Sequence, residues 1–65
     1  MLRAQDRMRD DALAAVGSIA YAIKYSTYPG GAQEGAEDIM EIVDAIQAGS
    51  YTGPVEALID RTLKD

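Results

Sequence analysis

Apolar residues recur every three or four positions along the first third of the chain, which is the spacing of a helix and not of a strand. The stripe consists of Met8, Ala12, Val16, Ile19 and Ile23, with Leu2, Leu13 and Ala20 at its edges. Pro29 closes the segment, because a proline biases the residue before it away from the helical region. The pattern predicts a helix over residues 2–26.

Two further segments show the same period. In residues 33–48 the apolar positions are Ala36, Ile39, Met40, Val43 and Ile46, with Ile42 on the flank. Gly49 follows at the position where a left-handed residue often caps a helix. Pro54 suits the first turn of another helix, and the apolar positions after it again follow a helical spacing. We therefore expect helices over 33–48 and 54–64.

These elements predict an all-α fold, with residues 1–65 forming a single small helical domain. The second helix runs antiparallel to the long first helix, and the short third helix closes the open side. At 1.5 Å per residue the first helix spans about 37 Å and the third only about 16 Å. Part of the first helix is thus left uncovered, and we expect a homodimer through it. The expected dimer interface consists of Leu13, Val16, Gly17, Ala20 and Tyr21.

Composition removes most catalytic chemistry from a chain of 65 residues. There is no Cys and no His, which excludes a thiol nucleophile, a disulfide framework and an imidazole base. The carboxylate pairs Glu34/Glu37 and Glu41/Asp44 lie on one predicted helix, so they do not face each other as a magnesium site requires. We expect a protein that is not an enzyme, with no catalytic residue, no metal site and no cofactor.

Charge and hydropathy limit the classes of partner that we expect for this chain. The net charge is −5 and the isoelectric point is about 4.4, whereas nucleic-acid binding depends on Lys and Arg to neutralise phosphates. The longest uncharged, mostly apolar run before the first loop, residues 12–23, has 12 residues, and a membrane span needs about 20. We therefore expect no direct contact with nucleic acid, no membrane segment and a cytoplasmic location.

Three tyrosines stand out on the first predicted helix. Tyr21, Tyr25 and Tyr28 are spaced four and three residues apart, which places them in a row opposite the apolar stripe. Tyrosine is frequent at protein interfaces because its ring buries apolar area while its hydroxyl group keeps a polar partner. The row is predicted to be an interface, either to a second copy or to a target. The alternative is that the rings only cover the bundle and keep their hydroxyl groups in water.

Acidic residues gather on the second predicted helix. Residues 25–60 contain seven Asp and Glu and no Lys or Arg. Four of these acids share a helix face opposite the apolar positions, namely Glu34, Glu37, Glu41 and Asp44. This acidic ridge is interpreted either as a solvated face or as a docking surface for a basic partner.

These features favour binding over catalysis. The leading hypothesis is a non-enzymatic protein-binding module that occludes or scaffolds a larger protein partner through the partner's basic surface. Phage and mobile-element inhibitors of bacterial defence, anti-CRISPR proteins among them, share this size and charge, and the analogy rests on size and charge alone. One alternative is a homo-oligomer that sequesters a nucleotide, with Arg3 and Arg7 pairing a phosphate beside Tyr21 and Tyr25. Another is a structural subunit of a larger assembly.

Overall fold

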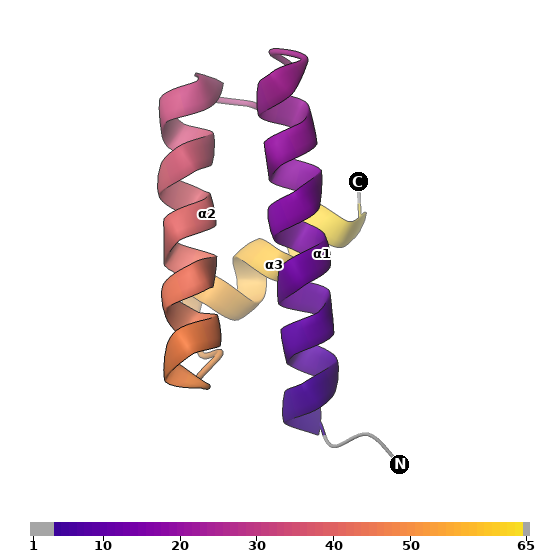
Figure 1. The fold of residues 1–65 in the computed structure, drawn as a ribbon, viewed down its shortest axis with the longest axis vertical. Helices are drawn as coiled ribbons and strands as arrows, with labels where there is room; N and C mark the ends of the chain where they lie inside the picture. Colours follow the sequence, from indigo (N-terminus) through magenta and orange to yellow (C-terminus); the bar gives the residue numbers. More distant parts are fainter. Residues whose placement is uncertain (1–3, 65) are drawn as a thin grey trace.

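The computed structural model describes residues 4–64 and consists of three α-helices joined by two short loops. They are α1 (Ala4–Lys24), α2 (Gly31–Ala48) and α3 (Pro54–Lys64). α1 and α2 lie side by side and antiparallel, and α3 crosses behind both of them (Figure 1). The predicted all-α fold is confirmed, and residues 4–64 contain no strand. None of the three described helices is long and apolar enough to cross a membrane.

The loop between α1 and α2 has the expected length but lies two residues earlier in the chain. α1 ends at Lys24, two residues early, because Ser26 takes a left-handed conformation with φ 57°. α2 begins at Gly31, two residues before the predicted start. Gly30 and Gly31 have φ values of 89° and 90°, a region that residues with a Cβ rarely adopt. The expected start of the first helix at residue 2 lies outside the described residues.

The remaining helix ends agree with the sequence. Gly49 caps α2 in the left-handed conformation with φ 69°, and its N–H donates to the carbonyl oxygens of Ala45 and Ile46. Pro54 is the first residue of α3, as predicted, where its missing N–H costs no helical hydrogen bond.

The core lies where the three helices meet. α1 contributes Ala12, Ala15 and Ile19, and Ile42 of α2 packs against Leu58 and Ile59 of α3. Ile19 and Ile42 are the largest side chains that are fully buried. Two of the three α1 core residues are alanines, which lets the neighbouring helices approach α1 closely. The predicted stripe of α1 is therefore the side that packs inward.

The buried face of α2 is rotated from the predicted one. The buried residues are Gly35, Ile42 and Ala45, so Ile42 lies at the centre of the face and not on its flank. Met40 was expected to face the core and is 65% exposed. The cause is the packing of Gly35 against Ile23, where an added Cβ would lie 2.7 Å from the Ile23 Cδ1 atom. This contact turns residues 35 and 42 toward α1, and it turns Met40 away.

Candidate interaction surfaces

Tyr21 and Tyr25 form an exposed aromatic pair at the C-terminal end of α1. Their ring centroids lie 4.7 Å apart, and the ring planes are tilted by 47°. The Lys24 ammonium group lies 5.3 Å from the centroid of the Tyr25 ring, a cation–π distance. Tyr21 is 67% exposed and Tyr25 is 54% exposed. The pair is therefore a preformed apolar surface with polar hydroxyl groups, which suits contact with a protein.

Tyr28 does not extend this pair, so the expected row of three tyrosines is wrong. α1 has ended before Tyr28, and the loop directs its ring inward, where it packs against the core. The Tyr28 hydroxyl group donates a hydrogen bond to the carboxylate of Asp38 on α2. Burial, followed by this hydrogen bond, raises the pKa of Tyr28 to about 12. Tyr28 thus connects the first loop to α2 through this hydrogen bond.

The five residues expected at a dimer interface differ in their exposure. Leu13 is 54% exposed, and Gly17 and Ala20 are also exposed. Val16 is half-buried and packs partly against the core, while Tyr21 belongs to the aromatic pair. Four of the five positions are therefore accessible to a second molecule.

The acidic ridge is exposed along its whole length. All four of its members are exposed on α2, namely Glu34, Glu37, Glu41 and Asp44. Asp38, the remaining acid of α2, is half-buried and accepts the hydrogen bond from Tyr28. The ridge therefore keeps four carboxylates for solvent or for a partner.

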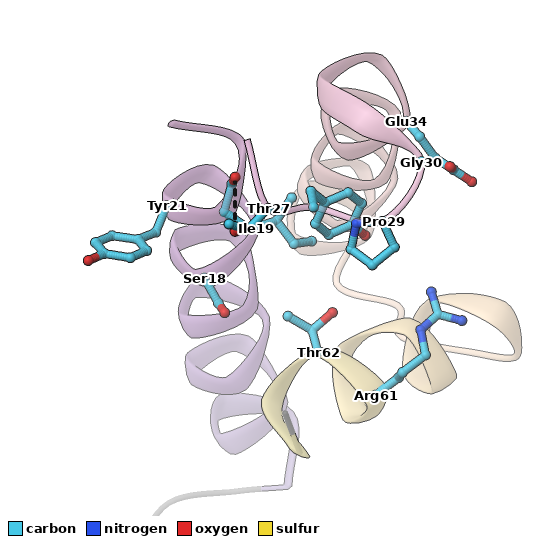
Figure 2. A pocket seen from close by; sticks show the side chains of 11 residues that line it. Ser18, Ile19, Tyr21, Thr27, Pro29, Gly30, Glu34, Arg61 and Thr62 are labelled. Atoms are coloured by element: carbon cyan, nitrogen blue, oxygen red, sulfur yellow. Dashed lines mark hydrogen bonds between the residues drawn. The ribbon is translucent and has the colours of Figure 1, made fainter. Parts of the chain in front are cut away.

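The tyrosine pair and the acidic ridge lie on opposite flanks of the molecule. Tyr21 and Tyr25 are each two residues from Ile23, which contacts α2 at Gly35, so they point away from α2. Glu37 is likewise two residues from Gly35 and points away from α1. Figure 2 shows the side chains of Tyr21 and Glu34 projecting to opposite sides. A single copy therefore does not present both groups on one flat face.

The arginine residues near the N-terminus do not complete a site with the tyrosines. Arg7 is exposed, but fourteen residues separate it from Tyr21, which is about 21 Å along a helix. Arg3 lies outside the described residues. The cation that the structure places beside the aromatic pair is Lys24.

An open cleft of about 740 Å³ lies between the C-terminal half of α1, the first loop and α3. Ile19 and Tyr28 supply apolar lining, and Ser18 and Thr62 supply hydroxyl groups. The Arg61 side chain rises from α3 toward the loop that holds Pro29 (Figure 2). Among the described residues, the one ion pair joins Lys64 to Asp60, with 3.1 Å between Nζ and Oδ2. The Arg61 guanidinium group is thus available to an anion in the cleft.

Sequence reasoning missed three of these residues. Arg61 lines the same cleft as the first loop only because α3 crosses α1, and no local pattern indicates this placement. The exposure of Met40 follows from the rotation of α2, which the apolar pattern does not resolve. Asp38 did carry a signal, since it is the one acid of α2 that lies off the predicted acidic ridge.

Among the described residues, no group of three or more Asp and Glu side chains lies close enough to hold a metal ion. Comparisons with protein-family models, with curated proteins and with solved structures give no match to this chain.

Proposed function

We propose that this protein is a non-enzymatic binding module that occludes or scaffolds a larger protein partner. The observation that carries the proposal is the pair Tyr21 and Tyr25, whose rings contact each other, are more than half exposed and point away from α2. Large aromatic side chains that stay exposed in the free protein are typical centres of binding energy at interfaces.

The acidic ridge supports the same function by a different physical effect. Four exposed carboxylates on one helix attract a basic partner and accelerate its association, particularly at low salt. The tyrosine pair then supplies contact area, while the ridge supplies steering. The homodimer predicted from the length of the first helix would give the partner two such surfaces, but the binding function does not require it.

The test is capture of a host protein by the wild-type chain and by variants of the aromatic pair. The double change Tyr21→Ala, Tyr25→Ala should reduce capture by at least about tenfold, because a central interface aromatic contributes about 2 kcal/mol or more. The double change Tyr21→Phe, Tyr25→Phe keeps both rings and should retain most of the binding. Circular dichroism should show full helix content in both variants, since the rings are exposed.

Unchanged capture by the alanine variant would remove the aromatic pair from the proposal. If capture survives that change but fails for Glu37→Gln, Glu41→Gln, the partner binds through the acidic ridge instead.

A second candidate function is binding of a small anionic ligand such as a nucleotide. The observation that favours it is the cleft, whose lining includes Arg61, the Tyr28 ring and the Ser18 hydroxyl group. A ligand at 100 times its dissociation constant stabilises the fold by about 2.7 kcal/mol. A nucleotide panel in a thermal-shift assay should therefore raise the melting temperature, and Arg61→Gln should abolish the shift. Absence of any shift would exclude this candidate.

A further inference from the structure

The α1–α2 pair has an apolar side that α3 does not cover. In α1, Ala22 points toward the α3 side, Ile23 points toward α2, and Lys24 points toward the uncovered side, because each residue turns the helix by about 100°. Figure 1 shows this side facing the viewer, with α3 behind. The same rotation defines an open face with eight members, namely Leu13, Val16, Gly17 and Ala20 of α1 and Ala36, Ile39, Met40 and Val43 of α2.

The open face combines a projection with a depression. Met40 is 65% exposed and stands out from α2. Gly17 and Ala20 are exposed on α1, and a Cβ added at Gly17 would meet no atom within 4 Å. In this antiparallel pair Gly35 of α2 lies level with Ile23 of α1. Moving forward along α2 therefore means moving backward along α1, so Met40 lies level with the part of α1 between Gly17 and Ala20. A methionine and a hollow of matching height therefore lie side by side on one surface.

We propose that the open face binds a second copy of this chain, with the two-fold axis parallel to α1 and α2. α1 of each copy then packs on α2 of the other, and Met40 of each copy enters the hollow at Gly17 and Ala20 of its partner. The four long helices form an up-and-down bundle in which all neighbouring helices are antiparallel. Each copy keeps α3 on the outside.

Charge favours one of the two ways of placing two such faces together. Every charged residue of α2 is acidic, whereas α1 carries Lys24 at one end of the open face and both Arg9 and Asp10 near the other end. An axis parallel to the helices brings Lys24 beside the acidic α2 of the other copy. An axis across the helices would instead bring two acidic α2 helices together, and like charges destabilise such a contact.

The size of the open face is sufficient for a specific dimer. α2 has 18 residues, which gives a length of about 27 Å, and two adjacent helices of about 10 Å diameter each give a width of about 20 Å. Contact over this area buries about 500 Å² per copy and about 1,000 Å² in total, which is the lower limit for a specific interface. We therefore expect a dimer that forms at micromolar concentrations and dissociates on dilution.

The proposed arrangement also unites the two candidate binding surfaces. Tyr21 and Tyr25 of one copy come to lie on the same side as the acidic ridge of the other copy, although a single copy holds them on opposite flanks. This consequence rests on the proposed binding function, whereas the dimer rests only on the open face.

Light scattering after size-exclusion chromatography tests the dimer. The wild-type chain of 7.0 kDa should elute with twice that mass, and Met40→Glu should raise the dissociation constant by at least about tenfold, because it buries an unpaired carboxylate. Ala14→Glu places the same charge on the outer flank of α1 and should leave the dimer intact. Both positions are exposed, so circular dichroism should show an unchanged fold.

The absence of cysteine allows a second measurement of the arrangement. A mixture of the Ala20→Cys and Met40→Cys variants should oxidise to a disulfide-linked heterodimer, whereas Met40→Cys alone should stay uncrosslinked. Self-crosslinking of Met40→Cys would overturn the proposed axis. A wild-type chain that stays at 7.0 kDa up to millimolar concentration would overturn the dimer, as would loss of the dimer in Ala14→Glu but not in Met40→Glu. Partner capture through the tyrosine pair could still succeed in those cases, so the two proposals fail separately.

Discussion

Tyr28 and Tyr25 are three residues apart, yet their environments give them different tasks. Tyr25 directly follows the last residue of α1 and keeps its ring in solvent beside Lys24. Tyr28 follows the left-handed turn at Ser26, packs against the core and donates to Asp38. A half-buried hydroxyl group that donates to a carboxylate contributes this hydrogen bond to stability only while it holds its proton. The consequence is a fold whose first loop responds to alkaline pH.

We predict that the free energy of unfolding falls as the pH rises from about 10 to about 12. The pKa of Tyr28 is raised from 10.0 to about 12 in the folded protein, so its contribution is complete below pH 10 and is lost as the pH passes the folded value. Denaturant titrations of wild type and Tyr28→Phe at several pH values measure this difference. The phenylalanine variant should be about 1 kcal/mol less stable at neutral pH and should lack this part of the alkaline loss.

Asp38→Asn is the control for this prediction, because it keeps a side-chain oxygen that can accept the hydrogen bond but removes the charge. The alkaline loss should be smaller and should end at lower pH in this variant, since the folded-state pKa of Tyr28 moves back toward 10.0 once the carboxylate that opposes its ionisation is gone. Equal pH dependence in wild type and Tyr28→Phe would contradict the assignment.

Among the helices, α2 shows how packing selects one side of a broad apolar arc. Its apolar residues cover more than one face, and the spacing places Met40 on the core face and Ile42 on its flank, the reverse of what the structure shows. The absence of a side chain at Gly35 permits the close approach of Ile23, and this contact sets the rotation of the whole helix. Two helical glycines therefore differ in their surroundings. Gly35 is packed against Ile23 and Tyr28, whereas no atom lies within 4 Å of a Cβ built at Gly17.

We predict that alanine at these two positions changes stability in opposite directions. Gly17→Ala should raise the free energy of unfolding by about 1 kcal/mol, because alanine is the better helix former and its Cβ meets no atom within 4 Å. Gly35→Ala gains the same propensity, but its Cβ would lie 2.7 and 2.8 Å from two Ile23 atoms and 3.2 Å from a ring carbon of Tyr28. The resulting overpacking costs about 1–3 kcal/mol, so the variant should be less stable than wild type.

Thermal melts measure this pair of effects, with a rise of about 4–8 °C expected for Gly17→Ala. The measurement is made in the Met40→Glu background, so that association does not contribute. A stabilised Gly35→Ala variant would show that α2 does not depend on the close contact with Ile23.

The molecule as a whole is organised by a small core with one uncovered side. Its fully buried large side chains are Ile19 and Ile42, and a domain of 65 residues with so few of them is near the lower limit of independent stability. Burying the open face in a dimer adds apolar contact that the monomer cannot provide. The Met40→Glu variant therefore tests both the oligomeric state and the source of the stability.

The two candidate binding surfaces lie on opposite flanks of the molecule. The tyrosine pair points away from α2 and the acidic ridge points away from α1, so one partner contacts both only by reaching around the molecule or by meeting a dimer. Comparing partner capture by Met40→Glu with capture by the tyrosine variants separates these cases, because the first change leaves both flanks intact.

Local physics made the three helices, the C-terminal end of α2 and both ends of α3 predictable from the sequence. Helical spacing, the cap at Gly49 and the first-turn position of Pro54 act over neighbouring residues, and the structure agrees with each of them. The exposure of Tyr21, Tyr25 and the acidic ridge was also predictable, because each group lies opposite the apolar stripe of its own helix.

The remaining features depend on contacts between residues distant in the chain. The contact of Gly35 with Ile23 set the rotation of α2, and the hydrogen bond from Tyr28 to Asp38 removed Tyr28 from the expected row. The crossing of α3 created the cleft at Arg61 and left the open face on the other side. Helix formation depends on residues that are near one another in the chain, so the local pattern predicts it. Which side of each helix stays open depends on how three helices share one core, and only the packed structure decides that.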